Sequence, residues 1–212
     1  MRRYPIRFAR ALILLHRTFR LLPFGARLHA LIRFLTCPFL RVVAHVPRGA
    51  RVLEIGAGHG VFLALAKEAG AARATGVEPD LRKVFIAPRS IEFIAGFDDA
   101  VRGHFDAIAM IDVLYAIPKS EWDPLLARIA ARTDLLLLKE MDPRRRLKNA
   151  WNRLQETISI KVTRITMAEA IVFEDPEGMR ARLGRAGFTD VEVVNVDAWY
   201  PHPHVLYVAR KG

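Results

Sequence analysis

Hydrophobic residues near the N-terminus follow the spacing of an α-helix. They recur every three or four positions over the first two dozen residues: Phe8, Leu12, Leu15, Phe19 and Leu22. At about 100° per residue this spacing places them on one narrow stripe. Four arginines project from the opposite side: Arg3, Arg10, Arg17 and Arg20. The pattern therefore predicts an amphipathic helix, which Pro23 ends.

A second apolar face follows Pro23. Four residues share one side of a predicted short helix: Leu28, Leu31, Ile32 and Leu35. Pro38 and Pro47 then bracket a third short segment. We therefore divide the chain into a basic amphipathic helical extension (1–47) and a second domain (48–212).

From residue 51 onward the pattern changes to an alternation of strands and helices. The predicted strands are Arg51–Ile55, Ala74–Glu78, Ile91–Ile94, Phe105–Ile111, Asp134–Lys139, Val191–Val196 and His204–Ala209. The predicted helices are Val61–Ala69, Lys119–Arg132, Arg144–Thr157 and Pro176–Ala186, and the pattern is ambiguous over Ile158–Phe173.

Strands separated by helices indicate a parallel sheet with both faces covered. The last two predicted strands lie too close together for a helical crossover, so they should pair antiparallel. We therefore predict an α/β fold. It is a Rossmann-like, doubly wound, mostly parallel seven-stranded sheet with an antiparallel last strand, plus the N-terminal helical extension.

Positive charge is concentrated in the predicted extension. Residues 1–46 hold nine arginines, no lysine and no acidic residue, so they carry +9 of the net charge of +11. A hydrophobic content of 52% excludes a disordered chain. The single cysteine, Cys37, excludes a disulfide framework and an all-cysteine zinc site, and no His/Cys/Asp spacing suggests a metal.

No apolar run approaches the roughly 20 residues that a membrane-spanning helix needs. We expect a cytoplasmic protein whose extension can reach the inner face of the membrane as a peripheral contact. The arginine-rich start also fits an organelle transit peptide. The apolar periodicity continues into the body of the chain, which disfavours that alternative.

A glycine-rich segment follows the first predicted strand: Glu54-Ile-Gly56-Ala57-Gly58-His-Gly60. Glycine permits a tight turn and a close approach of a ligand to the backbone, and the helix N-terminus behind it offers free N–H groups. Eighteen residues after Gly60, Glu78-Pro79-Asp80 ends the second strand. A carboxylate at that position can accept both hydroxyls of a ribose.

Two nucleotide-binding patterns compete for this segment. A dinucleotide fingerprint G-x-G-x-x-G counted from Gly56 needs a third glycine at the position of Val61. The observed pattern instead resembles motif I of class I S-adenosylmethionine-dependent methyltransferases, and Gly76–Asp80 resembles the acidic motif that follows it. A glycine-rich turn without a ligand is the third alternative.

The resemblance covers about Arg51–Arg210 and implies a set of cofactor-binding residues. They are Glu54, Gly56, Ala57, Gly58, Gly60, Glu78, Pro79, Phe97, Asp98, Asp112 and Leu114. Phe97 and Asp98 follow the third strand, where the family places groups beside adenine. Asp112 and Leu114 follow the fourth strand, where they would line the pocket. S-adenosylmethionine is the implied cofactor.

Polar and aromatic residues after the fourth and fifth strands are candidates for the acceptor side of the site. The candidate acid–base residues are Tyr115, Glu140, Asp142 and His204, and the candidate acceptor-binding residues are Tyr115, Lys139, Trp151, Asn152 and Gln155. For each acid–base candidate, a structural hydrogen bond is the alternative role. This set resembles a subgroup of bacterial methyltransferases from lipid or polyketide-like gene neighbourhoods.

We expect methyl transfer to a small-molecule or lipid-like acceptor, at oxygen or carbon. The fourth-strand motif Asp112-Val-Leu-Tyr115 lacks the prolines of amino-group methylases that act on bases. An RNA methyltransferase is the first alternative, and a non-catalytic cofactor-binding adaptor at the membrane is the second. The extension itself could lie on a bilayer, dock on the domain or bind nucleic acid. Nucleic acid is less favoured, because the aromatic residues lie opposite the arginines.

Overall fold

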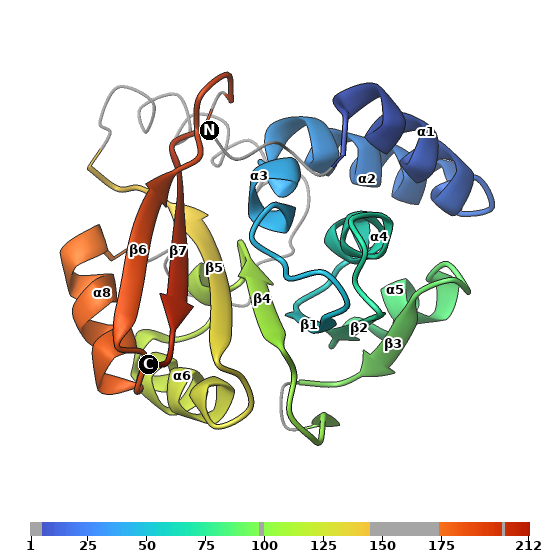
Figure 1. Cartoon of the computed structure of the whole chain (residues 1–212). Helices are drawn as coiled ribbons and strands as arrows, with labels where there is room; N and C mark the ends of the chain where they lie inside the picture. The colour runs from blue at the N-terminus through green and yellow to red at the C-terminus, as the bar shows by residue number, and fades with distance from the viewer. Residues whose placement is uncertain (1–5, 98–99, 145–173, 201) are drawn as a thin grey trace.

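The computed structural model describes residues 6–97, 100–144, 174–200 and 202–212 (Figure 1). Three helices come first: α1 (Phe8–Phe19), α2 (Phe24–Thr36) and α3 (Phe39–Val43). The strands are β1 (Arg51–Ile55), β2 (Arg73–Glu78), β3 (Glu92–Ala95), β4 (Ala107–Ile111), β5 (Leu135–Met141), β6 (Asp190–Asn195) and β7 (His204–Arg210). The later helices are α4 (Val61–Glu68), α5 (Leu81–Ile86), α6 (Trp122–Ala130) and α8 (Pro176–Arg185), with short 3₁₀ turns η2 (Leu114–Ala116) and η3 (Lys119–Glu121).

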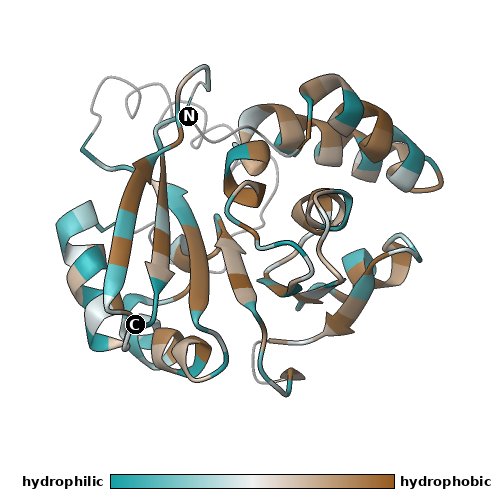
Figure 2. Ribbon diagram, in the orientation of Figure 1, coloured by the Kyte–Doolittle hydropathy of each residue, from teal (hydrophilic) through white to brown (hydrophobic). Residues whose placement is uncertain are grey.

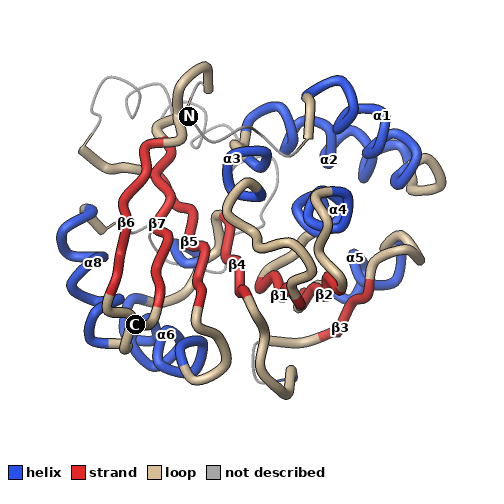
Figure 3. Tube along the Cα trace, viewed as in Figure 1, coloured by secondary structure: helices blue, strands red, loops and turns tan. Residues whose placement is uncertain are grey.

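The seven strands form one sheet in the order β3-β2-β1-β4-β5-β7-β6 (Figure 3). The pairs among β1 to β5 are parallel, and β7 runs antiparallel to both β5 and β6. The predicted fold is therefore confirmed, including its antiparallel last strand. The strand order reverses between β1 and β4, which is where open α/β sheets bind ligands.

Helices cover the two faces of the sheet and enclose two hydrophobic cores. One core combines apolar residues of α1, α2, α3 and α4 with sheet residues such as Leu137 and Leu206. The other combines residues of α6 and α8 with Leu136, Leu138 and Tyr207. Successive residues of β5 thus enter opposite cores, as the alternation of side chains along a strand requires.

The predicted apolar stripe of the first helix is largely buried, since Leu15, Phe19 and Leu22 lie in the core, whereas the predicted face of the second helix is not. On α1, Ala11, Leu15 and Phe19 are buried, whereas Phe8 is half exposed. On α2, Ala30 and Phe34 are buried, and the whole predicted apolar face of this helix points away from the core. Small residues allow the helices to approach α4 closely, so the residues of highest hydropathy need not be the buried ones. The division at residue 47 stays a prediction, although the extension shares a core with the sheet.

The predicted element boundaries differ from the structure at a few points. Helix α5 is absent from the prediction, and the predicted helix 119–132 is split into η3 and α6, with Pro124 in the first turn of α6. Strand β5 continues to Met141. The predicted helix Arg144–Thr157, apart from Arg144 itself, and the ambiguous segment Ile158–Phe173 lie outside the described residues. In the part of the chain that the structure describes, no helix combines the length and apolar character needed to cross a bilayer.

Candidate active site

The glycine-rich turn leaves β1 in a backbone conformation that other residues rarely adopt. Gly56, Gly58 and Gly60 have φ values of 72°, 57° and 82°, in the left-handed region that favours glycine. A Cβ added to Gly56 would lie 2.5 Å from Cγ2 of Val113. A Cβ on Gly58 would meet no atom within 4 Å. The turn is therefore tightly packed against Val113 at Gly56, whereas a small side chain at Gly58 would meet no protein atom.

Glu78, at the end of β2, holds this turn in place. Its Oε2 accepts a hydrogen bond of 2.7 Å from the Gly58 N–H. Its Oε1 accepts one from the Asp80 N–H at 3.1 Å and lies 3.5 Å from Nζ of Lys83. The carboxylate is buried, and parallel pairing places it beside the turn, as the sequence predicts. Oε2, whose hydrogen-bond donor is the Gly58 N–H, still has a lone pair with which to accept a hydroxyl.

Glu54, in β1 just before the turn, carries a buried oxygen with no hydrogen bond. Its side chain is 3% exposed, and Oε2 has no partner among the described residues. Burial raises the pKa of Glu54 well above its usual value, against the opposing charge of Arg33. A buried carboxylate oxygen without a donor is costly. A cationic ligand beside it would remove that cost.

A small cavity of about 50 Å³ lies between the turn and α2. Its lining comes from both sides: His29, Ala30, Arg33, Phe39, Glu54, Gly56, Ala57, Gly58, His59, Val61 and Ile111. Nδ1 of His29 is 3.3 Å from Nδ1 of His59, so α2 touches the turn directly. Burial lowers the pKa of both imidazoles, that of His59 to about 4. Both rings are therefore neutral at pH 7.

A buried charged cluster lies beside this cavity. Nη1 of Arg33 is 3.0 Å from Oδ2 of Asp112, and Nζ of Lys139 donates to Oδ1 of the same carboxylate. Lys139 is completely buried. Burial alone would raise the pKa of Asp112, but the charges of Lys139 and Arg33 lower it far below its usual value. The cluster therefore joins α2 to the ends of β4 and β5 with all three groups charged.

His204, at the start of β7, adjoins the same cluster. Its Nε2 is 2.9 Å from the carbonyl oxygen of Thr36 and donates to it, while its Nδ1 is buried without a partner among the described residues. Burial, followed by the charge of Lys139, lowers the pKa of His204 to about 3. The ring is therefore neutral at pH 7, with a free lone pair on Nδ1.

A larger cavity of about 380 Å³ opens at the same edge of the sheet. It is lined by Asp142, Arg144, Val193, Asn195, His204 and Val205. Asp142 accepts the backbone N–H of Arg144 at 3.0 Å and pairs with its guanidinium. His204 lines this cavity, and Arg33 lines the smaller one. The cluster of Arg33, Asp112 and Lys139 therefore adjoins both cavities.

Glu140 lies on the other face of the sheet from Lys139 and His204. Its Oε1 accepts the Leu114 N–H at 3.0 Å, and it lines a narrow space with Trp122 and Tyr207. Burial, followed by the charge of Asp112, raises the pKa of Glu140 to about 8. The structure therefore places Glu140 on the opposite face of the sheet from His204, while its hydrogen bond to Leu114 brings it next to the turn that carries Tyr115.

The remaining predicted residues have varied surroundings. Ala57 lines the small cavity, Leu114 is fully buried, and Tyr115 is half-buried in η2. Pro79 and Phe97 are exposed, and both follow strand ends beside the turn. Four predicted residues lie outside the described part of the chain: Asp98, Trp151, Asn152 and Gln155.

Two residues of the site, Arg33 and His29, are absent from the sequence-based prediction. They belong to α2 and contact partners 79 and 30 positions away. The sequence does carry a signal for Arg33, because it is the one charged residue on the side of α2 opposite its apolar face. Within the described residues, no group of three or more His, Cys, Asp or Glu side chains is arranged to hold a metal ion.

Comparisons with known proteins agree with this geometry. Residues 27–193 match the family described as a methyltransferase domain. A solved S-adenosylmethionine-dependent methyltransferase from Archaeoglobus fulgidus has a TM-score of 0.66 at 15% identity, covering 94% of this chain and 99% of that one. A possible histamine N-methyltransferase from Thermotoga maritima has a TM-score of 0.64 at 18% identity, covering 94% and 100%. No curated protein matches the chain in sequence.

A third similar structure holds a ligand. Magnesium protoporphyrin IX methyltransferase from Synechocystis, crystallised with S-adenosylhomocysteine, has a TM-score of 0.59 at 17% identity and covers 94% of both chains. The chain belongs to the methyltransferase domain family, and its enzyme class is S-adenosylmethionine-dependent methyl transfer.

The residues at the turn suit this cofactor. S-adenosylmethionine carries a sulfonium and an ammonium, and the unpartnered oxygen of Glu54 offers a buried negative group. Glu78 is placed to accept hydroxyls, and a Cβ added at Gly58 would meet no protein atom within 4 Å. We therefore expect Glu54, Glu78 and the turn to hold the cofactor.

Two glycine variants should separate cofactor space from backbone strain. Gly58 and Gly49 both have positive φ, and an added Cβ meets nothing within 4 Å at either position. Gly58→Ala and Gly49→Ala should each lower the free energy of unfolding by about 1–2 kcal/mol. Only Gly58→Ala should also weaken S-adenosylhomocysteine binding in calorimetry, by about tenfold or more. Equal affinities in the two variants would remove Gly58 from the cofactor site.

Proposed function

We propose that this methyltransferase acts on a small-molecule or lipid-like acceptor, at oxygen or carbon, while resting on an anionic membrane surface. The observation that carries the proposal is the exposed apolar face of α2. Five residues form it, and they are between 41% and 72% exposed: Phe24, Leu28, Leu31, Ile32 and Leu35. An apolar patch of this kind on an otherwise charged surface is typical of an interaction site.

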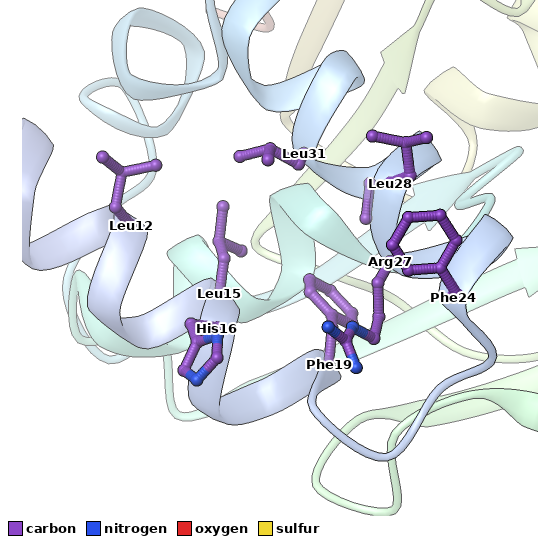
Figure 4. A pocket seen from close by; sticks show the side chains of 9 residues that line it. Leu12, Leu15, His16, Phe19, Phe24, Arg27, Leu28 and Leu31 are labelled. Carbon is purple, nitrogen blue, oxygen red and sulfur yellow. The ribbon is translucent and has the colours of Figure 1, made fainter.

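A groove between α1 and α2 continues this face inward. It has a volume of about 190 Å³, and Figure 4 shows side chains from both helices converging on it. Leu12, Leu15 and Phe19 line one side, while Leu28 and Leu31 line the other. His16 and Arg27 also lie along the groove, so charged and apolar groups meet there. An amphiphile with an anionic group fits this chemistry.

The charge around the face favours an anionic partner. The first 46 residues contain arginine but no acidic residue, and Arg7, Arg17, Arg20 and Arg27 are exposed. Figure 2 shows hydrophobic and hydrophilic residues side by side along α1 and α2. Each basic residue near an anionic bilayer adds about 1 kcal/mol of attraction. Single-stranded RNA is less favoured, because the exposed aromatic residue Phe24 lies among leucines.

The bound cofactor would supply a methyl group activated by the positive sulfonium. The residues of the chain would orient the reacting groups and exclude water. We propose the 380 Å³ cavity as the acceptor site, with the buried Nδ1 of His204 accepting a hydrogen bond from a hydroxyl of the acceptor. Asp142 would hold Arg144 at this cavity, where a guanidinium could bind an anionic group of the acceptor.

Two phenylalanine variants test the membrane surface. Phe24 on α2 and Phe85 on α5 are both largely exposed. Phe24→Ser should weaken co-sedimentation with phosphatidylglycerol vesicles by about tenfold, because a buried phenylalanine contributes a few kcal/mol. Phe85→Ser is the matched control and should bind like the parent. Equal loss in the two variants, or equal binding to phosphatidylcholine vesicles, would contradict an anionic docking face on α2.

The acceptor can be sought with a labelled methyl group. The enzyme is incubated with a bacterial lipid extract and S-adenosylmethionine carrying a deuterated methyl, and products are followed by mass spectrometry. We expect a lipid-soluble species that gains one labelled methyl, and no gain with a His204→Phe variant. Label that enters only added RNA would support the alternative acceptor. Label in neither, with cofactor bound, would favour the non-catalytic adaptor.

A further inference from the structure

Helix α2 has two functional faces on opposite sides. Its outer face is the exposed apolar surface proposed to meet lipid. Its inner face carries His29 and Arg33, which touch the glycine-rich turn and Asp112. At about 100° per residue, Arg33 lies nearly opposite Leu35 on the helix. One helix therefore connects the proposed lipid-facing surface to the cavity beside the turn.

We propose that α2 is a lid over the cofactor site, and that contact of its outer face with an anionic bilayer favours the displaced, open position of the lid. The proposal rests on the proposed membrane function. It adds that lipid binding and cofactor binding are coupled through this helix.

The cavity between α2 and the turn is small in the position that α2 adopts. About 50 Å³ lies between α2 and the turn, which is room for a few water molecules. An adenosyl group with an amino-acid tail needs several times that volume. Two contacts of α2, from Arg33 to Asp112 and from His29 to His59, join the helix to the strand ends and to the turn beside this cavity. The cofactor therefore requires a displacement of α2.

Displacement of α2 would expose apolar surface that a bilayer can cover. Ala30 and Phe34 are 2% exposed, and Phe34 stacks on Phe8 of α1 at 5.3 Å. Moving α2 away from the body exposes this apolar surface. Exposure to water is unfavourable, whereas a lipid surface can cover it. The bilayer thus binds the open state better than the closed state, and such a difference is what shifts an equilibrium.

The contacts that hold the lid closed involve polar groups. The Arg33–Asp112 ion pair leaves Asp112 still bonded to Lys139 when Arg33 departs. The Arg33 side chain is one-third exposed in the closed position. Opening therefore leaves Asp112 paired with Lys139 and exposes the Arg33 guanidinium to water, so neither charge is buried without a partner.

The first measurement is the affinity of the full chain for S-adenosylhomocysteine, with and without vesicles. We expect phosphatidylglycerol vesicles to tighten binding by about threefold or more, because the binding-competent state becomes more populated. Phosphatidylcholine vesicles should have no effect. The double variant Ile32→Ser/Leu35→Ser, on the outer face, should lose the vesicle effect, and Phe85→Ser should retain it.

The second measurement uses Cys37, the single cysteine of the chain, as a reporter of lid position. It is fully buried at the end of α2, and burial raises the pKa of its thiol to about 12. Displacement of α2 should expose the thiol and lower its pKa. We expect phosphatidylglycerol vesicles to raise the rate of modification by a water-soluble maleimide about fivefold or more. A Cys37→Ser variant gives the background.

The affinity for S-adenosylhomocysteine and the rate of Cys37 modification together decide the proposal. Tighter ligand binding together with faster thiol modification supports a lid. Faster modification with weaker ligand binding indicates vesicle-induced unfolding and overturns it. Unchanged affinity and unchanged modification, with vesicles bound, overturn the lid while leaving the membrane function intact. No vesicle binding at all rejects both, and vesicle binding without ligand binding rejects the cofactor role of the cavity.

Discussion

Glu54→Gln is expected to weaken binding of S-adenosylmethionine by about 10- to 100-fold, the range for a lost hydrogen bond to a charged group. The variant keeps the shape of the side chain and removes its charge. S-adenosylhomocysteine keeps the ammonium that we place near Glu54, so its affinity should fall by a similar factor. Stability should rise or stay unchanged, because the buried oxygen has no partner to lose among the described residues. Weaker binding without lower stability is the signature of a ligand-binding carboxylate.

Calorimetry across pH checks this role. Burial raises the pKa of Glu54, and a cation needs the charged carboxylate. The affinity of the parent for S-adenosylmethionine should therefore increase as the pH rises through that pKa, and Glu54→Gln should lose this dependence. Glu177→Gln, at an exposed position in the first turn of α8, is the control. Parent-like affinity in Glu54→Gln would exclude Glu54 from the cofactor site.

Lys139→Met is expected to cause a large loss of stability, about 3–5 kcal/mol in urea denaturation. The variant removes one of the two cations that hold Asp112, and the methionine fills a similar volume. Asp112 then keeps Arg33 alone, at a site where its side chain is one-tenth exposed. The double variant Lys139→Met/Asp112→Asn should recover part of the loss, since the remaining charge, that of Arg33, is on a side chain that is one-third exposed and can be hydrated.

The pH dependence of stability gives an independent check. The pKa of Asp112 is lower in the folded chain than in the unfolded chain. Its stabilising contribution is therefore full above the unfolded pKa and is lost as the pH falls through acid values. Lys139→Met should flatten this acid dependence. A loss below about 1 kcal/mol, with the parent's acid dependence, would show that Lys139 does not hold Asp112.

Hydrophobic periodicity was sufficient to predict the sheet. The alternating elements from Arg51 onward, and the short link before β7, determine a parallel sheet with an antiparallel last strand. The glycine pattern and Glu78 also fall together as predicted, because parallel strands bring their carboxyl ends to one edge. Local spacing and strand direction carry these conclusions without any knowledge of tertiary contacts.

The parts that depend on tertiary contacts could not be predicted in the same way. Periodicity finds the apolar face of α2 but not that Ala30 and Phe34 form the packed side. Arg33 reaches Asp112 across 79 positions, a contact that no local pattern encodes. Glu140 and Lys139 are adjacent in sequence, so alternation along β5 sends them to opposite faces, and this could have been anticipated.

A crystal of the full chain with S-adenosylhomocysteine would test the central claim most directly. We expect electron density for the ligand over the turn at Gly58, with its ribose hydroxyls at Glu78 and its amino-acid end near Glu54. We also expect α2 to be displaced from its present position. A ligand bound elsewhere, with α2 unmoved and the space above Gly58 filled by protein side chains, would contradict it.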